Sequence, residues 1–457
     1  MSERIPSWTL RELCEILGRE LREVRGSAHA ALCGVVTDSR GITPQCLFIA
    51  IRGAKFDGHD FAAQAGRQGA GAVIVDHYIE ECACPQLIVE DTLDAYGAIA
   101  RNWRQRFSCP VICVVGANGK TTTTQMIASI LRAAAGDEGV LATQRNFNNQ
   151  VGVPMTLLGM TDQTRLAVIE AGMNHPGEMS RLASFIRPDV VVVTNAQREH
   201  QEFLDGIEGS ARENGLAIVS LPEDGVAVLP QCDPCAQIWK DIARARGCRI
   251  LWYAQGTESE LTVRRRGRRL TIRPSEGESA EIDFALPGEH VAHDAAAAAA
   301  AALAAGVSLE AVCRGLEAFR PVKGRGVHHE LASGALVIDE AYNANPDSMR
   351  ASIDVLAGLR APRILIAGDM AEVGETSQLV HAEIGAYAKQ KGIDEFWCAG
   401  TQMAAAADAF GENARRFDSV DDLIEAARGA AQKPVSMLVK ASNCMGFAKI
   451  VEALVQG

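Results

Sequence analysis

The sequence predicts an α/β protein of three domains, and three observations lead to that prediction. The chain has 457 residues, which is too long for one ordinary hydrophobic core. Short apolar segments alternate with helix-length segments, a pattern that indicates mainly parallel sheets with helices on both faces. The character of these segments changes near residues 108 and 324, so we expect domains at 1–108, 109–324 and 325–457.

The domain expected at 1–108 contains four short apolar runs separated by loops. They predict strands at 34–36, 47–51, 72–75 and 87–89, and a helical stretch over 91–107 closes the domain. We therefore expect a small α/β domain at the N-terminus.

The second domain opens with the buried-strand pattern Val111-Ile112-Cys113-Val114-Val115, which leads into a glycine-containing loop and then a helix-length segment. Apolar strands are also expected at 166–169 and 190–193, each followed by a polar loop. Ligands of open α/β sheets gather at the carboxyl ends of parallel strands. We therefore expect the binding residues of this domain in the loops after these strands, within a doubly wound, mainly parallel sheet.

Later in the second domain, apolar segments at 261–263 and 270–272 flank five arginines and Gly267. Gly267 suits the turn of a hairpin. A run of arginines could bind nucleic acid, but the net charge of the chain is -12, so a solvated hairpin is the favoured interpretation. The third domain alternates strand and helix again, with strands expected at 336–338, 364–367, 396–399 and 437–439.

Composition excludes several classes of protein. Hydrophobic residues make up 47% and charged residues 22% of the chain, the balance of a folded globular protein. The first twenty residues have no signal-peptide core, and no apolar run reaches the roughly 20 residues of a membrane span. We expect a cytoplasmic protein with neither nucleic-acid nor membrane partners. The 13 cysteines are scattered among apolar neighbours, and loop positions are favoured over zinc or redox roles for the pairs Cys82/Cys84 and Cys232/Cys235.

The most specific motif is a phosphate-binding loop that follows the strand at 111–115. Its glycines permit the positive φ values that let a backbone wrap an anion. A lysine supplies charge for the β- and γ-phosphates, a threonine hydroxyl can reach Mg²⁺, and the helix from Thr122 onward directs its first N–H groups to the same place. The pattern departs from G-x-x-x-x-G-K-[ST], because Val114 stands at the first glycine position. The loop is Gly116-Ala117-Asn118-Gly119-Lys120-Thr121.

Polar residues follow the other strands of the second domain. Glu170 comes directly after the strand at 166–169, and a carboxylate there could bind the metal of a bound nucleotide; an N-cap or loop carboxylate is the alternative. Asn195 and His200 follow the strand at 190–193. We expect a metal or substrate role for His200, with a structural loop histidine as the alternative.

Asparagines crowd one short loop, in which Asn146, Asn148 and Asn149 lie within four residues. Asparagine clusters often only build turns, but they also offer donors and acceptors to a peptide-like substrate. The polar runs 339–346 and 368–372 follow strands of the third domain in the same manner, which indicates a ligand-facing edge there.

Together these motifs resemble the Mur ligase family. The strings G-A-N-G-K-T-T-T, N-F-N-N-Q-V-G-V-P, I-E-A-G-M-N-H-P-G-E, D-E-A-Y-N-A-N-P-D-S-M and G-D-M-A-E-V-G occur in order, and T-D-S-R, L-F-I-A-I-R-G and F-D-G-H-D-F precede them. The resemblance covers nearly the whole chain. It is strongest to family members that add D-alanyl-D-alanine to UDP-N-acetylmuramoyl-tripeptide.

The resemblance implies a UDP-sugar-binding domain, a central ATP domain and a Rossmann-like C-terminal domain. It also implies ATP-dependent amide ligation in peptidoglycan precursor synthesis, through an acyl phosphate and with two Mg²⁺ ions. The expected partners are these small-molecule substrates, and we expect a monomer. A paralogous ligase with another amine or carboxylate, and a catalytically inactive nucleotide-binding relative, are the alternatives.

Family roles transfer to matching positions of this sequence. The resemblance implies that Lys120, Glu170 and His200 are catalytic, that Thr121 and Glu170 serve one metal, and that His200 serves the other. The nucleotide would contact the loop Gly116–Thr122 and also Arg325, Asp339 and Asn345. The substrate would contact Ser39, Arg40, His59, Asn146, Asn148 and Asn149.

Three departures from the family pattern stand out. Asn214 occupies the position of a lysine that family members carbamylate and use as a ligand of the second Mg²⁺. Neighbouring Glu213 points about 100° away if the segment is helical. The family string G-x-H-N-x-x-N is replaced over 288–294, where both asparagines are lost, and Asn443 replaces an arginine.

Overall fold

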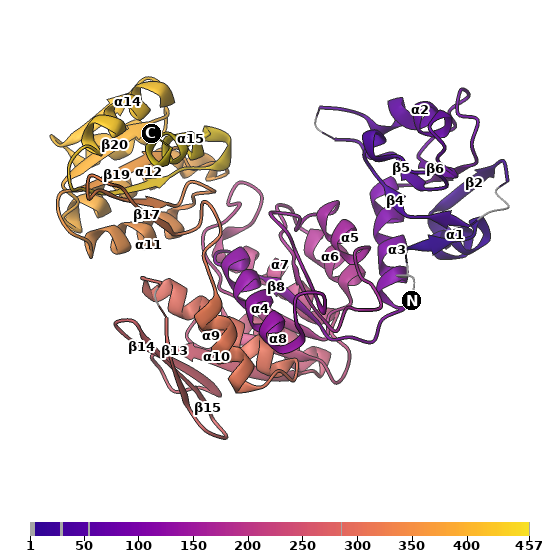
Figure 1. The fold of residues 1–457 in the computed structure, drawn as a ribbon, viewed down its shortest axis with the longest axis horizontal. Helices are drawn as coiled ribbons and strands as arrows, with labels where there is room; N and C mark the ends of the chain where they lie inside the picture. The colour runs from indigo at the N-terminus through magenta and orange to yellow at the C-terminus, as the bar shows by residue number, and fades with distance from the viewer. Residues whose placement is uncertain (1–4, 28–30, 54, 285, 457) are drawn as a thin grey trace.

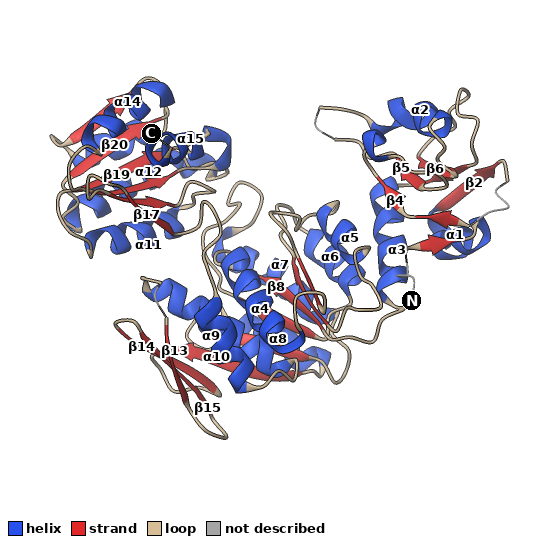
Figure 2. Ribbon diagram, in the orientation of Figure 1, coloured by secondary structure: helices blue, strands red, loops and turns tan. Residues whose placement is uncertain are grey.

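The computed structural model describes residues 5–27, 31–53, 55–284 and 286–456 (Figure 1). Strands and helices alternate along the chain. The strands of the described residues form four sheets, with two, five, nine and six strands. Helices lie on both faces of the nine-stranded sheet (Figure 2). The predicted α/β fold class is confirmed, and no helix among the described residues is long and apolar enough to cross a membrane.

The N-terminal part contains the five-stranded sheet, with order β2-β7-β6-β5-β4. The strands of this part are β1 (Ser7–Trp8), β2 (Leu21–Arg25), β3 (Leu32–Cys33), β4 (Val35–Val36), β5 (Leu47–Ile49), β6 (Ala72–Val75) and β7 (Gln86–Val89). Its helices are α1 (Leu10–Leu17), α2 (Ala62–Arg67) and α3 (Thr92–Arg104). The sequence predicted β4 to β7 and α3 to within a few residues but missed β1, β2, β3, α1 and α2.

Helix α3 joins the N-terminal sheet to the central sheet. Asp91 caps its first turn by accepting hydrogen bonds from the amides of Leu93 and Asp94, at 2.7 and 3.0 Å. On its far side, Gly97 lies against the ring of Phe185 so closely that a Cβ there would sit 2.1 Å from the ring. Trp103 donates to the carbonyl of Met160 at 3.1 Å. One hydrophobic core therefore runs without interruption from the N-terminal sheet into the central one.

The central sheet has order β16-β15-β14-β13-β12-β11-β8-β10-β9. It is parallel from β9 to β14, and β15 and β16 are antiparallel additions at one edge. The parallel strands are β8 (Val111–Val115), β9 (Val140–Ala142), β10 (Leu166–Glu170), β11 (Val190–Val193), β12 (Val226–Pro230), β13 (Arg249–Gln255) and β14 (Leu261–Arg266). The antiparallel ones are β15 (Arg269–Pro274) and β16 (Ala280–Asp283).

The predicted hairpin is confirmed as β14 and β15, which pair antiparallel around Gly267 at φ 61°. Its arginines form exposed ion pairs with nearby carboxylates, including Arg264 with Glu258 at 2.7 Å and Arg268 with Asp283 at 2.9 Å. These local pairs support the interpretation of a solvated hairpin.

The helices of the central part cover both faces of the sheet. They are α4 (Lys120–Ala135), α5 (Gly152–Leu157), α6 (Glu178–Ile186), α7 (Gly206–Val219), α8 (Ala236–Arg246), α9 (Glu289–Ala304) and α10 (Leu309–Ala318). The alanine run of α9, from Ala295 to Ala302, is fully buried. Small side chains let α9 lie close to α4 and to the sheet, and Asp294, in the second turn of α9, lies beside Gly119 of the phosphate loop.

The C-terminal part has a six-stranded sheet with order β17-β18-β22-β19-β20-β21, parallel except for β17. Its strands are β17 (Val327–Glu330), β18 (Leu336–Asp339), β19 (Arg363–Gly368), β20 (Glu395–Ala399), β21 (Ala414–Phe417) and β22 (Ser436–Lys440). Its helices are α11 (Pro346–Ala357), α12 (Ser377–Gln390), α13 (Met403–Phe410), α14 (Val420–Ala430) and α15 (Ala448–Val455). Two separate hydrophobic cores, one on each face, stabilise this part.

Candidate active site

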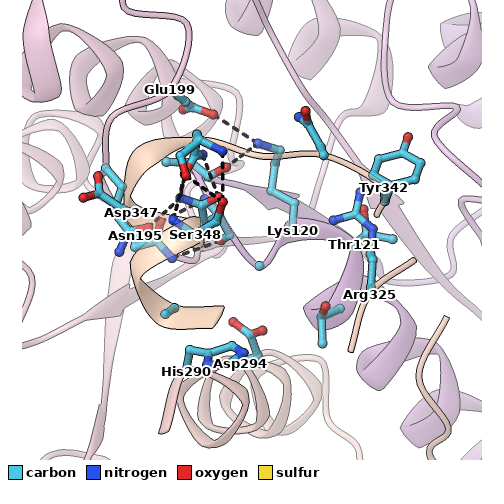
Figure 3. Close-up of a pocket in the computed structure, with 18 of the residues that line it drawn as sticks. Lys120, Thr121, Asn195, Glu199, His290, Asp294, Arg325, Tyr342, Asp347 and Ser348 are labelled. Carbon is cyan, nitrogen blue, oxygen red and sulfur yellow. Dashed lines mark hydrogen bonds and ion pairs between the residues drawn. The ribbon is translucent and has the colours of Figure 1, made fainter. Parts of the chain in front are cut away.

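A cavity of about 1210 Å³ lies between the central and C-terminal parts of the chain. Helix α3 contributes Leu93 to its wall, the central part contributes the phosphate loop, and the C-terminal part contributes residues such as Tyr342 and Asp347. Figure 3 shows Lys120 and Thr121 of the phosphate loop together with Tyr342 and Asp347. The cavity is thus lined by all three parts of the chain and lies at the carboxyl ends of the central strands. This is the place expected for the ligand of an open α/β sheet.

The phosphate loop has the backbone conformation that its glycines predict. Gly116 has φ 123°, and a Cβ there would sit 2.2 Å from the hydroxyl of Thr194. Gly119 has φ 79°, and a Cβ would sit 2.3 Å from a carboxylate oxygen of Asp294. Both positions therefore require glycine for conformation and for space. Helix α4 begins at Lys120, two residues earlier than predicted, so its N-terminal N–H groups face the cavity.

Lys120 turns back onto its own loop. Its ammonium donates to the carbonyls of Gly116 and Ala117, at 2.5 and 3.0 Å, and lies 3.2 Å from Glu199 Oε2. The ammonium is therefore held beside the strand end where phosphate oxygens would gather, and those oxygens would draw it away from the loop carbonyls and from Glu199.

Glu170 is the last residue of β10 and is buried at 1% exposure. Its Oε1 accepts from the hydroxyl of Thr121 at 3.1 Å and from the amide of Asn148 at 2.7 Å. Its Oε2 has no hydrogen-bond partner among the described residues and is buried. A buried carboxylate oxygen without a partner is costly, and a carboxylate beside a hydroxyl is an oxygen donor set that Mg²⁺ accepts. The residues present therefore fit the metal that the sequence predicts there.

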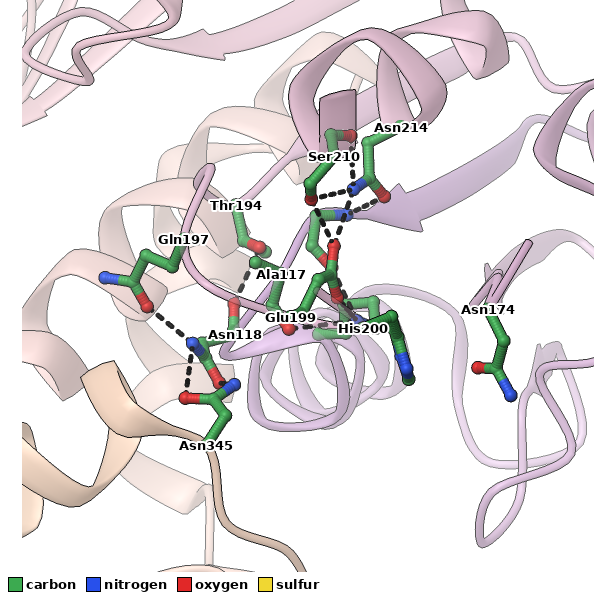
Figure 4. Close-up of polar contacts among 12 residues, drawn as sticks. Ala117, Asn118, Asn174, Thr194, Gln197, Glu199, His200, Ser210, Asn214 and Asn345 are labelled. Atoms are coloured by element: carbon green, nitrogen blue, oxygen red, sulfur yellow. Dashed lines mark hydrogen bonds and ion pairs between the residues drawn. The ribbon is translucent and has the colours of Figure 1, made fainter. Parts of the chain in front are cut away.

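The loop after β11 lies against the phosphate loop and is hydrogen-bonded to it (Figure 4). Asn195 Oδ1 accepts from the backbone amide of Asn118 at 2.9 Å, and the hydroxyl of Thr194 donates to the Asn118 carbonyl at 2.7 Å. The Asn118 side chain forms a reciprocal amide pair with Asn345, at 2.8 and 3.2 Å. Asn345 also caps α11, because its Oδ1 accepts from the amide of Ser348. The phosphate loop is thereby connected directly to the C-terminal part.

Asn214 is buried in α7 and faces the phosphate loop. Its Oδ1 accepts from the amide of Gly116 at 2.9 Å, and its Nδ2 donates to Glu199 Oε1 at 2.8 Å. Sequence reasoning missed Glu199, which is 5% exposed and lines the cavity beside Lys120. Its position next to His200 was the available signal. Glu213 instead accepts from the amides of Gly177 and Met179, so it points away from the loop as helix geometry predicted.

We expect the activity of this protein to be independent of dissolved CO₂. An asparagine side chain forms no carbamate, so Asn214 has no bicarbonate-derived group to lose. The measurement compares turnover in degassed buffer, with and without added bicarbonate. A matched family member that carries the lysine serves as the responsive control, and a marked bicarbonate stimulation of this protein would contradict the prediction.

The His200 imidazole reaches across to the C-terminal part. Its Nδ1 bonds the carboxylate of Glu372, which leaves Nε2 as the nitrogen available to a ligand. Both residues adopt left-handed backbone conformations, with φ 46° and 59°, and such strain in non-glycine residues is concentrated at functional sites. His200 lines the cavity, and its metal or substrate role stays a prediction.

Arg198 links the same loop to the C-terminal part. It pairs with Asp347 at 2.7 Å and with Glu383 at 3.0 Å, and these carboxylates raise its pKa. Glu383 also bonds Arg350 at 2.7 Å, and Arg198 depresses the pKa of Glu383. The two parts are thus connected by polar pairs rather than by a shared core.

Replacing Arg198 with alanine is expected to raise the KM for ATP roughly three- to tenfold. The reason is that its two ion pairs help to keep the C-terminal part closed over the cavity. Steady-state kinetics measures the effect, and small-angle scattering is expected to show a larger radius of gyration. Arg350→Ala is the matched control, because it removes a contact to Glu383 within the C-terminal part alone. Equal effects in the two variants would contradict this role of Arg198.

One side of the cavity, where we expect the nucleoside to bind, is lined by a stacked arginine–tyrosine pair and by buried ionisable side chains. The Arg325 guanidinium lies 4.1 Å from the centroid of the Tyr342 ring, and both residues line the cavity. Burial raises the pKa of Asp294 well above its usual range, with Arg325 acting in the opposite direction, and burial lowers the pKa of His290 and His293. At neutral pH the two histidines are therefore uncharged. Asn443, the residue at a family arginine position, also lines the cavity.

Asp339 is not among the described residues that line the cavity. It is 2% exposed, and its carboxylate accepts from the backbone amides of Gly324 and Ala341, at 2.8 and 3.2 Å. It therefore shapes the segment that carries Arg325 rather than facing the cavity. Asn149 similarly accepts hydrogen bonds from the backbone amides of Val151 and Gly152 at the start of α5, although it also lines the cavity together with Asn146 and Asn148.

The predicted residues of the N-terminal part lie away from this cavity. His59 is buried, with Nδ1 bonded to Asp57 at 2.6 Å and Nε2 accepting from the amide of Asp76 at 3.1 Å. Arg40 is exposed and pairs with Asp38 at 2.6 Å, and Ser39 begins the short helical turn that Asp38 caps. The structure therefore does not bring Ser39, Arg40 and His59 together with the phosphate loop.

Comparisons with known proteins agree over the whole chain. The "Mur ligase family, catalytic domain" matches residues 32–104, the "Mur ligase middle domain" matches 114–302, and the "Mur ligase, glutamate ligase domain" matches 324–443. The UDP-N-acetylmuramoyl-tripeptide--D-alanyl-D-alanine ligase of Escherichia coli K12 is 36% identical over 457 residues, covering 98% of each chain. The enzyme of the same name from Bacillus subtilis 168 is 33% identical, covering 93% of each.

Solved structures show the same similarity. The crystal structure of MurF from Acinetobacter baumannii matches with a TM-score of 0.90 and 29% identity, covering 99% of this chain and 100% of that one. MurF ligase from Thermotoga maritima, solved in complex with ADP, matches with a TM-score of 0.81 over 92% of this chain and 97% of that one; at 22% identity it supports the fold alone. By family models, full-length identity and fold, this chain belongs to the Mur ligase family.

Proposed function

We propose that this protein is the ATP-dependent ligase that joins D-alanyl-D-alanine to UDP-N-acetylmuramoyl-tripeptide in peptidoglycan precursor synthesis. The observation that carries the proposal is the cavity, in which a phosphate loop and the buried carboxylate of Glu170 face residues from the other two parts of the chain. Similarity to ligases of that name over 98% of the chain agrees with it. The substrates are small molecules, and the products are ADP, phosphate and a UDP-muramoyl-pentapeptide.

The proposed reaction has two steps. A carboxylate oxygen of the tripeptide attacks the γ-phosphorus of ATP, the bond to the bridging oxygen breaks, and ADP leaves. The amine of D-alanyl-D-alanine then attacks the acyl carbon, phosphate leaves, and the amine nitrogen loses a proton. Such chemistry requires mainly positioning and neutralisation of phosphate charge.

The residues of the cavity suit these requirements. Lys120 and the N-terminus of α4 would bind the phosphate oxygens, and the loop Gly116–Thr122 would wrap them. Thr121 and Glu170 would hold one Mg²⁺ and His200 the other; when bound, these ions neutralise phosphate charge. Asn345 and Arg325 would contact the nucleotide from the C-terminal side, and Asp339 would act by holding the backbone near Arg325.

We also propose which substrate each of the three parts binds. Residues 1–108 would bind the UDP-sugar, with contributions from Ser39, Arg40 and His59. Residues 109–324 would bind ATP, with Asn146, Asn148 and Asn149 on the tripeptide side, and 325–457 would complete the site. We also propose that the protein works as a monomer in the cytoplasm, where its nucleotide-linked substrates are.

The test supplies UDP-muramoyl-tripeptide, ATP, Mg²⁺ and D-alanyl-D-alanine to the purified protein. Expected results are a pentapeptide product by mass spectrometry and one phosphate released per product. Parallel reactions replace the dipeptide with L-alanyl-L-alanine or with single amino acids, and they are expected to be inactive. Turnover with a different amine alone would replace this proposal with that of a paralogous ligase, and absence of any turnover would indicate an inactive relative.

A further inference from the structure

We infer that Glu199 supplies the anionic, metal-facing group that family members obtain from a carbamylated lysine, and that Asn214 is the positioning residue that holds it. The inference rests on the proposed function, because it concerns how the second metal of that reaction is bound. It assigns a metal-binding role to a carboxylate that no family motif identified.

The first argument comes from Asn214 itself. Its side chain is 1% exposed, and both ends of its amide are already bonded: Oδ1 to the amide of Gly116, and Nδ2 to Glu199 at 2.8 Å and the carbonyl of Ser210 at 3.0 Å. A neutral amide with these partners brings no negative charge to the cavity. The charge that a carbamate would contribute therefore has to come from another residue.

The second argument is the geometry of Glu199. Its Oε1 is anchored by Asn214 and by the hydroxyl of Ser210 at 2.7 Å. Its Oε2 is directed at Lys120, with an oxygen–nitrogen distance of 3.2 Å, and the residue lines the cavity. One oxygen is thus fixed by α7 while the other faces the place where phosphates would lie (Figure 4). A carboxylate held in this way is preorganised as a hard oxygen ligand.

The third argument concerns what happens to Glu199 when nucleotide binds. The Lys120 ammonium is its one ion-pair partner among the described residues. Phosphate oxygens attract that ammonium, so Oε2 loses a cation in a pocket where Glu199 is only 5% exposed. A buried carboxylate without a cation is strongly unfavourable. A divalent cation arriving with the nucleotide restores the balance, and His200, the next residue, lines the same cavity.

A purely structural role is the competing interpretation. In that case Glu199 would only tether Lys120 and α7, and its loss would change stability and lysine position but not the number of bound metal ions. Metal stoichiometry distinguishes the two interpretations without any turnover.

The experiment uses the full chain with a non-hydrolysable ATP analogue and Mn²⁺ as the probe, with bound Mn²⁺ counted by electron paramagnetic resonance. The wild-type protein is expected to bind two Mn²⁺ ions per analogue. Glu199→Gln, which keeps the shape of the side chain, is expected to bind the second ion roughly tenfold or more weakly. Glu202→Gln is the matched control, since Glu202 is exposed on the same loop, and it is expected to bind two. Two ions bound by Glu199→Gln with unchanged affinity would overturn the inference.

A second variant tests whether the lysine of the family pattern can take over the role proposed for Glu199. The double substitution Glu199→Ala with Asn214→Lys removes the carboxylate and introduces the lysine of the family pattern. Binding of the second Mn²⁺ is then expected to be weak without bicarbonate and to recover with it, whereas the wild-type protein is insensitive. Strong binding of the second ion in bicarbonate-free buffer would overturn the inference. Failure of the proposed function is separately visible, because it would leave these Mn²⁺ counts in place while no pentapeptide forms.

Discussion

Replacing Lys120 with alanine is expected to lower kcat by roughly 10³-fold or more while the protein stays folded. The ammonium lies at the first turn of α4, where, in the proposed reaction, it would neutralise phosphate oxygens as charge moves onto ADP. The side chain is only partly buried and bonds its own loop, so its removal leaves the hydrophobic core intact. Phosphate release under saturating substrates measures the effect, and circular dichroism verifies the fold.

The control for this prediction is Lys391→Ala, which removes a lysine that pairs with Asp354 on the surface of the C-terminal part. That variant is expected to keep full activity. The role of the phosphate loop would be refuted by an Lys120→Ala protein that turns over at the wild-type rate. A variant that loses activity only because it unfolds would be recognised by its lost circular dichroism signal.

Replacing Glu170 with glutamine is expected to lower kcat roughly 10²- to 10³-fold and to raise the Mg²⁺ concentration needed for half-maximal activity. Glutamine keeps the size of the side chain and an oxygen that can accept from Thr121 and Asn148. It removes the charge of the buried oxygen that has no partner among the described residues. A Mg²⁺ titration of phosphate release is therefore the informative measurement.

Thr121 provides a matched pair of variants for the same site. Thr121→Ser retains the hydroxyl that donates to Glu170 at 3.1 Å and is expected to stay active. Thr121→Val has nearly the same shape without the hydroxyl and is expected to resemble Glu170→Gln. If the valine and serine variants require the same Mg²⁺ concentration, the assignment of this metal site is wrong.

Local sequence signals predicted the centre of this site well. The run Val111–Val115 and the two glycines after it determine a strand, a turn and a helix start within a dozen residues, and all three are present. The helical period also placed Glu213 away from the phosphate loop, which the structure confirms. Such predictions succeed because each depends on neighbours in the chain.

Features that depend on distant segments could not be predicted in the same way. The pairing of Arg198 with Asp347 joins residues 149 positions apart and exists only because two sheets face each other. The contact between Glu199 and Asn214 requires β11 and α7 to be placed first. Asp339 and His59 show the converse, since their motifs predicted ligand contacts but their side chains are buried against backbone amides.

The hydrophobic core shared through α3 fixes the distance between the N-terminal sheet and the central sheet. Trp103 on this helix and Val111 at the start of β8 belong to the same hydrophobic cluster as Trp8 near the N-terminus, so the N-terminal sheet and the phosphate loop are two ends of one rigid frame. If residues 1–108 bind the UDP-sugar as proposed, this frame sets the distance that the attached peptide has to span to reach the γ-phosphate. Because one residue extends a chain by about 3.5 Å, a peptide one residue short would stop that far from the γ-phosphate, and the frame itself would reject it.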